Sequence, residues 1–211
     1  MLSSPVMNAS SGAPVSGTDL AGGVSPEKTA GSGLSSRVLN LGSGRKTVEG
    51  AVNIDRAADL GAEVIHDLDQ RPWPLPSDHF DEVLANDVIE HLGDVIGTFA
   101  EIHRICRDGA VVRITVPHFT CANAFTDPTH LHHFGYFSFD YLTGDNELSY
   151  YSSVKFRKRT VQLIFHPTLI NKLVWRFANR YPEAWERRWA WIFPAWFLNV
   201  ELEVVKSVPA A

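Results

Sequence analysis

Residues 39–46, "LNLGSGRK", decide the predicted fold, because two glycines one residue apart directly follow an apolar run. Glycine at 42 and 44 allows a positive φ and lets a ligand approach main-chain N–H groups without a Cβ in the way. The next strand-like run ends in "NID", which puts Asp55 at its tip. Ligands of open parallel sheets bind at the carboxyl edge of the strands, where this carboxylate can accept hydrogen bonds from both hydroxyls of a ribose. The pattern predicts a site for a nucleoside derivative.

Outward from this turn, β-prone runs alternate with helical patterns, which is typical of an α/β fold with a mostly parallel sheet and helices on both faces. About seven strands are predicted, at 37–42, 51–56, 62–66, 80–86, 110–117, 153–165 and 199–206. The clearest helix follows the fourth run, where Asp94 can cap its start and Gly109 its end. Its apolar face is Val95, Ile96, Phe99, Ile102, Ile105 and Cys106. Further helices are predicted at 167–180 and 182–197.

The first crossover is unusually short. Only residues 43–50 separate the first two predicted strands, whereas a parallel crossover usually needs about a dozen residues or more. Either the first helix is cut to about one turn, or the second strand starts late.

The composition fits one globular domain. The chain has 211 residues, of which 45% are hydrophobic and 20% charged, enough for a proper core. Its formal net charge of -5 argues against nucleic acid as a partner, because that binding needs clustered Lys and Arg. Two cysteines, Cys106 and Cys121, are too few for a disulfide framework, so a cytoplasmic location is expected.

The first 35 residues differ from the rest of the chain. They include 21 Ser, Gly, Ala or Pro and no apolar run, so we predict a disordered tail over 1–35 and a folded domain over 36–211. The sequence has neither a secretory signal pattern nor an uninterrupted apolar window of about 18 residues. No targeting or transmembrane segment is predicted.

Two other nucleotide-binding signatures are incomplete here. A dinucleotide fingerprint needs a third glycine at the start of a full helix, and after Gly44 and Arg45 the chain continues with Lys46 and no glycine at that spacing. The stretch "GSGRKT" also lacks the spacing of a phosphate-binding P-loop. The glycine turn therefore favours a nucleoside ligand without a pyrophosphate.

Several motifs taken together resemble a known enzyme family. "RVLNLGSG" is followed by "VNID", then by "HDLDQRPWPLPSDHFDEVLANDVIEHL" and "EIHRICRDGAVVRITVPH". In order and spacing, over roughly residues 37–118, they resemble the class I S-adenosylmethionine-dependent methyltransferases. The resemblance is to the small-molecule branch that includes the quinone methyltransferases, with a methyltransferase type 11 domain. It implies a Rossmann-like fold and S-adenosylmethionine as the cofactor.

The resemblance also implies roles for single residues. Gly42, Ser43 and Gly44 would form the loop under the methionine part of the cofactor, and Asp55 would bind the ribose. Asp67 and Leu68 would hold the adenine, while Asn86, Asp87 and His91 would lie beside the methionine tail. The sequence departs from the family at Asn40, where an acid is common, and in its short first crossover.

Catalytic candidates follow the fifth predicted strand, in "PHFTCANAFTDPTHLHHFGYFSFDYL", residues 117–142. Methyl transfer to a hydroxyl needs a base for its proton, and histidine suits that role at neutral pH. We predict His118 and His130 as base or substrate-orienting groups, Asp127 as the residue that holds a histidine tautomer, and His133 as a further candidate. The aromatic residues of 118–150 are expected to form a lid.

The same residues allow other interpretations. His118, Asp127, His130 and His133 are ligand types that also suit Zn or Fe, but their spacing matches no metal motif, so no metal is predicted. They can also be histidines of a capped turn that bond only to the backbone. Cys121 has no neighbours that would lower its thiol pKa, so it is not a nucleophile candidate.

The C-terminal part is rich in tryptophan. In the helix predicted at 182–197, one face consists of Trp185, Trp189, Ile192, Phe193 and Trp196. Packing on the sheet, a homodimer surface, and contact with a membrane or a lipid-linked substrate are the alternatives. Basic residues at 155 and 157–159 can meet an anionic substrate or lie on a solvated edge strand.

The predicted protein is a cytoplasmic methyltransferase that uses S-adenosylmethionine and methylates a small molecule, at oxygen, with histidine as general base. A non-catalytic interaction module of the same fold and a nicotinamide-dependent oxidoreductase are the alternatives.

Overall fold

The computed structural model describes residues 34–144, 147 and 149–206. Most of the tail predicted over 1–35, namely residues 1–33, therefore lies outside the described residues. Among those described, no helix is long and apolar enough to cross a membrane.

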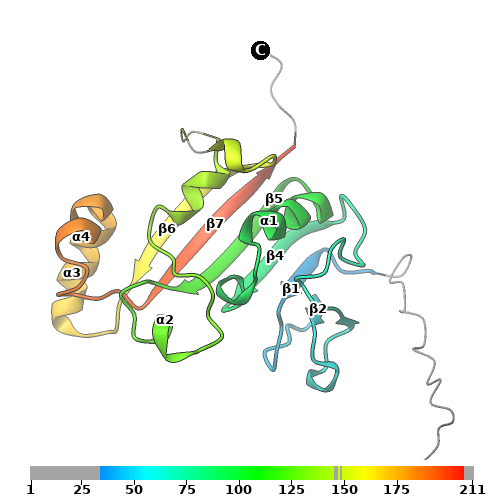
Figure 1. Cartoon of the computed structure of the whole chain (residues 1–211), viewed down its shortest axis with the longest axis horizontal. Helices are drawn as coiled ribbons and strands as arrows, with labels where there is room; N and C mark the ends of the chain where they lie inside the picture. Colours follow the sequence, from blue (N-terminus) through cyan, green and yellow to red (C-terminus); the bar gives the residue numbers. More distant parts are fainter. Residues whose placement is uncertain (1–33, 145–146, 148, 207–211) are drawn as a thin grey trace, which may run out of the picture.

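A seven-stranded sheet forms the centre of the domain (Figure 1). The strands are β1 (Val38–Leu41), β2 (Val52–Asp55), β3 (Val64–Ile65), β4 (Phe80–Asn86), β5 (Cys106–Pro117), β6 (Lys155–Ile164) and β7 (Phe197–Val205). Their order is β3-β2-β1-β4-β5-β7-β6. The pairs among β1 to β5 are parallel, whereas β7 is antiparallel to both β5 and β6. The predicted α/β, Rossmann-like fold is confirmed.

One face of the sheet carries the core. Alternating residues of β4, β5 and β7 are buried on this face, including Val83, Val112 and Val200. The helix α1 (Val95–Ile105) covers this face with Phe99, Ile102 and Ile105, all completely buried. Asp94 caps α1 as predicted, because its side chain accepts a hydrogen bond from the Gly97 N–H at 2.9 Å.

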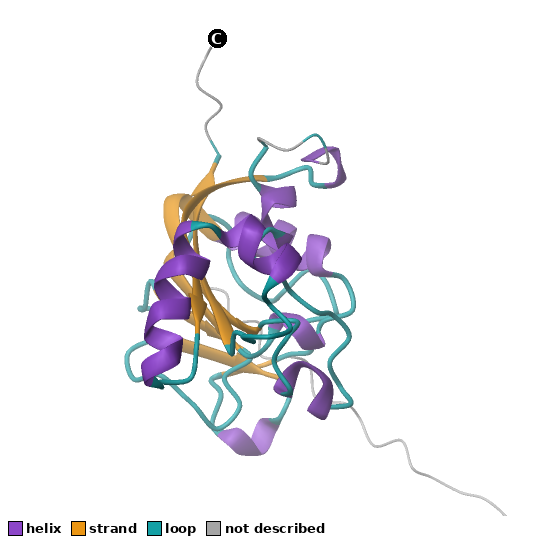
Figure 2. Ribbon diagram, turned by 90° about the vertical axis from the view of Figure 1, so that its left-hand side faces the viewer, coloured by secondary structure: helices purple, strands orange, loops and turns teal. Residues whose placement is uncertain are grey.

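The opposite face of the sheet is more polar. Arg113 on β5 forms ion pairs there with Glu82 on β4 and Glu201 on β7. The helix α3 (Leu169–Arg180) packs at the β6 end of this face, where Asn179 bonds to the backbone N–H and carbonyl of Leu163 at 2.8 and 3.0 Å. Helices therefore lie on either side of the twisted sheet, as Figure 2 shows.

The predicted end of the first long helix is wrong. Cys106 begins β5 instead of lying on the helix face, and Gly109 lies inside the strand. Cys106 pairs with Phe80, and the N–H of His79 donates to the carbonyl of Ile105 at 2.8 Å. The helix therefore ends at Ile105 because the next residue pairs with β4, although the helical pattern of apolar residues continues to Cys106.

The helix predicted over 182–197 is also too long. It is confirmed as α4 (Pro182–Arg188), after which the chain turns and enters β7 at Phe197. Trp185 lies on α4 and is fully buried, whereas Trp189 and Ile192 are exposed and lie beyond its end. The tryptophans therefore do not share one helical face.

The remaining segments are short. The first crossover forms turns over the described residues 42–51, which explains how so few residues join two parallel strands. The predicted lid over 118–150 contains three short helices and has residues 145–146 and 148 outside the described chain. The short helices of the domain are η1 (Ala58–Leu60), η2 (Ile89–His91), α2 (Asn123–Thr126), η3 (Ser138–Leu142) and η4 (Ser149–Tyr151).

Candidate active site

The glycine turn after β1 requires glycine for a steric reason. Gly42 and Gly44 have positive φ values of 61° and 49°. A Cβ at Gly42 would overlap the side chain of Val88, which follows β4. The turn is held against β2 by the Ser43 N–H, which donates to the Ile54 carbonyl at 3.1 Å. The close packing of the Val88 side chain against the turn, together with the positive φ, therefore explains the glycine at 42.

Asp55 is fixed by the backbone on both sides. One carboxylate oxygen accepts from the Gly44 N–H at 2.8 Å and the other from the Ala57 N–H at 2.9 Å. A carboxylate offers about four acceptor sites, so both oxygens keep capacity for further donors. Asp55 is thus a rigidly placed acceptor at the carboxyl edge of β2.

A cavity of about 380 Å³ opens at this edge. Its lining includes six of the residues predicted to bind the cofactor, which are Gly42, Asp55, Asp67, Leu68, Asp87 and His91. Ser43 and Gly44 belong to the adjoining turn. Thr129, from the segment after β5, closes the lining on another side. We call this space the glycine-turn cavity.

Asn86 is the one predicted cofactor residue that the structure places elsewhere. Its exposed side chain lines a second cavity on the polar face of the sheet, together with Arg113 and Glu201. Asp87, the next residue, has a positive φ of 52° and turns the chain back toward the glycine-turn cavity. There Lys46 Nζ lies 3.3 Å from Asp87 Oδ2.

A buried carboxylate lies beside two histidines next to this cavity. Glu90 is 1% exposed, and neither of its side-chain oxygens has a hydrogen-bond partner among the described residues. Burial raises the pKa of Glu90 to about 7, with a further contribution from the charges of Asp87 and Asp127. Glu90, His91 and His130 each offer one ligand atom within 4.8 Å of the others. We call these three residues the Glu–His–His cluster.

Asp127 is linked to this cluster through Thr129, and His130 is held by the backbone of Ala124. The Thr129 hydroxyl donates to Asp127 at 2.7 Å and contacts His91 Nδ1 at 2.9 Å, while His130 Nδ1 lies 3.2 Å from the Ala124 carbonyl. Hydrogen bonds from the Thr129 side chain and N–H lower the pKa of Asp127. The structure therefore places two of the four catalytic candidates next to residues that line the cavity. Asp127 accepts from Thr129, and the ring of His130 lies beside that of His91.

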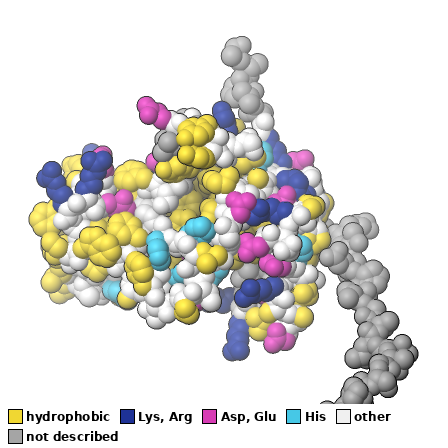
Figure 3. All heavy atoms as spheres, in the orientation of Figure 1, with side chains coloured by type: hydrophobic (Ala, Val, Ile, Leu, Met, Phe, Trp, Pro, Cys, Tyr) yellow, Lys and Arg dark blue, Asp and Glu magenta, His cyan; other side chains and the backbone are white. Residues whose placement is uncertain are grey.

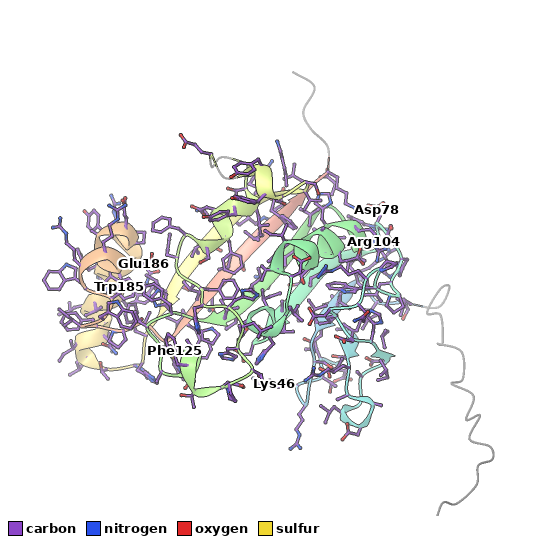
Figure 4. All side chains as sticks on the ribbon, viewed as in Figure 1. Lys46, Asp78, Arg104, Phe125, Trp185 and Glu186 are labelled. Carbon is purple, nitrogen blue, oxygen red and sulfur yellow. The ribbon has the colours of Figure 1, made fainter. Side chains whose placement is uncertain are left out.

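The other two catalytic candidates lie apart from the cluster. His118 is completely buried, with Nδ1 2.7 Å from the Thr120 hydroxyl and Nε2 3.1 Å from Glu186 of α4. Figure 4 shows Glu186 and Trp185 on α4, well away from Lys46 at the glycine turn. His133 is exposed, and its ring lies 4.4 Å from that of Phe125.

Glu90 and Thr129 are absent from the residues predicted from the sequence. The signal for Glu90 was a single acid within "DVIEHL", where Val88, Ile89 and Leu92 are buried around it. Thr129 lies 38 residues from His91 in the chain, and only the fold brings them together.

Residues 30–114 match a protein-family model described as "Methyltransferase domain". Similar solved structures include a SAM dependent methyltransferase from Archaeoglobus fulgidus, with 16% identity, a TM-score of 0.56, and coverage of 80% of this chain and 86% of that chain. An S-adenosylmethionine dependent methyltransferase from Mesorhizobium loti has 18% identity, a TM-score of 0.50, and coverage of 79% and 90%. The YcgJ protein from Bacillus subtilis has 13% identity, a TM-score of 0.52, and coverage of 82% and 93%. A comparison with curated protein sequences finds no match.

At these identities the solved structures share the fold with this chain. The matched segment contains the glycine turn, Asp55 and the Glu–His–His cluster up to His91, whereas Thr129 and His130 follow it. Chemically, the cavity can bind a nucleoside through Asp55 and main-chain groups, and its histidines can take part in proton transfer.

Proposed function

We propose that this chain, an S-adenosylmethionine-dependent methyltransferase, transfers the methyl group to an oxygen atom of a small-molecule acceptor and uses His91 and His130 to remove the acceptor's proton. The enzyme class and the cofactor rest on the methyltransferase domain over residues 30–114 and on the fold. The acceptor, the methylated atom and the residue roles are the proposal.

The glycine-turn cavity has groups that suit the cofactor. Ser43 Oγ and Asp87 Oδ1 are buried and have no hydrogen-bond partner among the described residues, so they are free to meet a polar ligand. At Gly44 a Cβ would meet nothing within 4 Å, so the main chain is accessible there, whereas at Gly42 the Val88 side chain occupies the space that a Cβ would fill. In the proposed arrangement Asp55 accepts from the ribose, Asp67 and Leu68 hold the adenine, and the glycine turn supports the methionine part.

When bound, S-adenosylmethionine supplies an electrophilic methyl group on a positively charged sulfur. The protein must align an acceptor oxygen with that methyl carbon and assist the loss of the hydroxyl proton. The O–H bond breaks with the help of the histidines, the oxygen bonds to the methyl carbon, and the carbon–sulfur bond breaks to leave a neutral thioether. The proton ends in solvent.

The observation that carries this proposal is the position of His130. It is a predicted base candidate beside His91, which lines the glycine-turn cavity, and the two ring centroids lie 4.6 Å apart. His118 has both ring nitrogens engaged with Thr120 and Glu186, so we propose a structural role for it at α4.

The test combines binding with turnover. S-adenosylhomocysteine titrated into the protein by calorimetry should bind, whereas NAD should not. On a panel of hydroxylated acceptors, His130→Ala should retain cofactor binding and lose turnover by roughly 100-fold or more. His133→Ala, which changes an exposed histidine of the same segment, is the matched control and should turn over normally. Equal turnover by the wild type and His130→Ala would contradict the role of His130.

We also propose that the enzyme reaches its acceptor at a membrane surface, which is one of the three uses that the tryptophan-rich segment allows. Large exposed apolar side chains gather on and beside α3 and α4, with Lys and Arg among them (Figure 3). We call them the α3–α4 surface; they are Leu169, Ile170, Leu173, Trp175, Phe177, Tyr181, Trp189, Trp191 and Ile192. Exposed apolar side chains together with Lys and Arg are typical of surfaces that bind to anionic lipid membranes.

The charges of this segment support that choice over a homodimer. The basic side chains between residues 169 and 192 are Lys172, Arg176, Arg180, Arg187 and Arg188, and the acidic ones are Glu183 and Glu186, although the whole chain has a formal net charge of -5. Two copies of a basic surface would repel each other, whereas anionic lipid would attract it. A cytoplasmic location is proposed because both Cys106 and Cys121 are free and buried.

A further inference from the structure

We propose that Glu90, His91 and His130 bind a divalent first-row transition-metal ion. Their ligand atoms lie within 4.8 Å of one another, and the site opens toward the glycine-turn cavity through His91. Three protein ligands would leave coordination positions for water or for an acceptor oxygen.

His91 has its free lone pair on Nε2. The Thr129 hydroxyl gives its hydrogen to Asp127 at 2.7 Å, so its oxygen must accept from His91 Nδ1–H across their 2.9 Å contact. This chain of hydrogen bonds fixes the tautomer of a neutral imidazole. A carboxylate that orients a metal-binding histidine through a hydrogen-bond partner is a usual feature of metal sites.

His130 is fixed in the same way. Its Nδ1 lies 3.2 Å from the carbonyl oxygen of Ala124, which can only accept, so Nδ1 carries the hydrogen and Nε2 carries the lone pair. In the neutral form of each histidine, the lone pair is therefore on Nε2, where it can bind a metal ion.

Glu90 supplies the charge that a cation needs. Its side chain is almost completely buried, and both oxygens lack a hydrogen-bond partner among the described residues, an arrangement that is costly without a bound ligand. The backbone keeps it beside His130, because the N–H groups of Leu131 and His132 donate to the Glu90 carbonyl at 2.8 and 3.2 Å. The cluster is thus built by main-chain contacts between η2 and the segment after β5.

The donor types define the class of metal. Imidazole nitrogen suits Zn, Fe, Ni or Cu, whereas Mg and Ca prefer sites made of oxygen only. Two histidines and one carboxylate with open positions are typical of non-haem iron sites and of catalytic zinc sites. We therefore expect Zn²⁺ or Fe²⁺ rather than Mg²⁺ or Ca²⁺.

The ion would assist the loss of the acceptor's proton that the proposed function requires, and this point rests on that proposed function. A hydroxyl bound to a divalent ion loses its proton to water much more readily than a free hydroxyl. His91 and His130 would then act by holding the ion rather than by taking up the proton themselves.

The test measures metal binding directly. Full-length protein freed of metal by a chelator is titrated with Zn²⁺ by calorimetry, and its Co²⁺ form is examined by absorption spectroscopy. We expect one ion per chain, at least a tenfold weaker Zn²⁺ affinity in Glu90→Gln and in His130→Ala, and a weaker affinity in Thr129→Val through the loss of orientation. His133→Ala should bind as the wild type does. Thermal melts without metal show whether each variant is folded.

The outcomes separate the two proposals. Absence of stoichiometric Zn²⁺ or Co²⁺ binding, or equal affinity in folded wild type, Glu90→Gln and His130→Ala, would overturn the metal site. Binding lost in those variants supports the site even if no acceptor is methylated, a result that would count against the proposed function alone. Full turnover by chelator-treated enzyme that loses activity in His130→Ala would leave the proposed function standing and assign His130 as a base.

Discussion

The main-chain N–H of Gly44 donates a hydrogen bond of 2.8 Å to Asp55 Oδ2, which joins the turn after β1 to the tip of β2. The same carboxylate accepts from the Ala57 N–H, so it holds two connections of the sheet while facing the glycine-turn cavity. Asp55 therefore has a structural role, and the proposed contact with the ribose would give it a second one.

Replacement of Asp55 separates these tasks. Asp55→Ala should weaken S-adenosylhomocysteine binding by at least roughly tenfold, because hydrogen bonds to a charged group contribute about 1.5–3 kcal/mol. Asp55→Asn keeps one acceptor oxygen and should fall between the wild type and Asp55→Ala. Calorimetry provides the affinities, and unchanged binding in Asp55→Ala would remove Asp55 from the ribose role.

Gly42→Ala should both destabilise the protein and block the cofactor. The new Cβ would overlap the Val88 side chain, and alanine would have to adopt the positive φ of this position. Together these effects should lower the free energy of unfolding by about 1–3 kcal/mol. Gly50→Ala is the matched control, since Gly50 has a positive φ of 78° but open space around its Cβ position. In urea denaturation, Gly42→Ala should have a lower free energy of unfolding than Gly50→Ala. Adding Val88→Ala to Gly42→Ala should restore part of the lost free energy. No difference between the two glycine variants would show that the clash is relieved by other means.

Glu90 should make the stability of the metal-free protein depend on pH. Its pKa is raised by burial from 4.5 to about 7 in the folded state, so the folded state binds the proton more tightly than the unfolded state. The free energy of unfolding should then fall by about 3 kcal/mol as the pH rises from 4.5 to 7, and stay lower above that. Glu90→Gln should be more stable than the wild type at pH 8 and similar to it near pH 4.

Glu101 is the control for that measurement. Its carboxylate is also mostly buried, but Arg104 at 2.7 Å and the Trp73 N–H at 2.8 Å satisfy it, and despite the opposing effect of burial its pKa is lowered. Glu101→Gln should therefore lose stability at pH 8. A gain in stability at pH 8 in both variants would indicate a general charge effect rather than an unpaired Glu90.

The α3–α4 surface should bind anionic vesicles. The wild type should sediment together with vesicles that contain phosphatidylserine. A smaller fraction of the protein should sediment with neutral vesicles. Replacing Trp191 and Ile192, which are 71% and 62% exposed, by Ala should reduce binding at little cost in stability. Replacing Phe125, exposed to 61% but outside the surface, is the control. A concentration-dependent dimer that Trp191→Ala disrupts, without vesicle binding, would show that a second copy covers the surface.

Much of the fold could be predicted because its local signals agree with its tertiary contacts. Some features are determined by residues that are close together in the chain. These features are the glycine turn, the Asp94 cap and the alternation of buried and exposed residues in β4 and β7. The errors occur where distant contacts override a local pattern. Cys106 continues the helical apolar pattern but pairs with Phe80, and Phe197 pairs with Pro117 and Ile164 instead of ending a helix.

The site could be predicted in part for a similar reason. The positions of Gly42 and Asp55 follow from strand ends, which the sequence marks clearly. The contact between Thr129 and His91 depends on the path of an irregular segment after β5, which no periodic pattern describes. Asn86 lies at the end of β4, but strand alternation points its side chain to the polar face of the sheet, away from the glycine-turn cavity.

The chain that carries α3 and α4 leaves the sheet at Ile164 and returns at Phe197, and these two residues are cross-strand partners. The two ends of this segment therefore lie next to each other, as in a tight hairpin. Changes in its length or sequence should leave the register of β6 and β7 unchanged. We expect that this segment can be replaced by another insert, provided that the packing of the fully buried Trp185 is preserved. We expect replacement of this insert to change what the α3–α4 surface contacts, while the strands around the glycine-turn cavity keep their alignment.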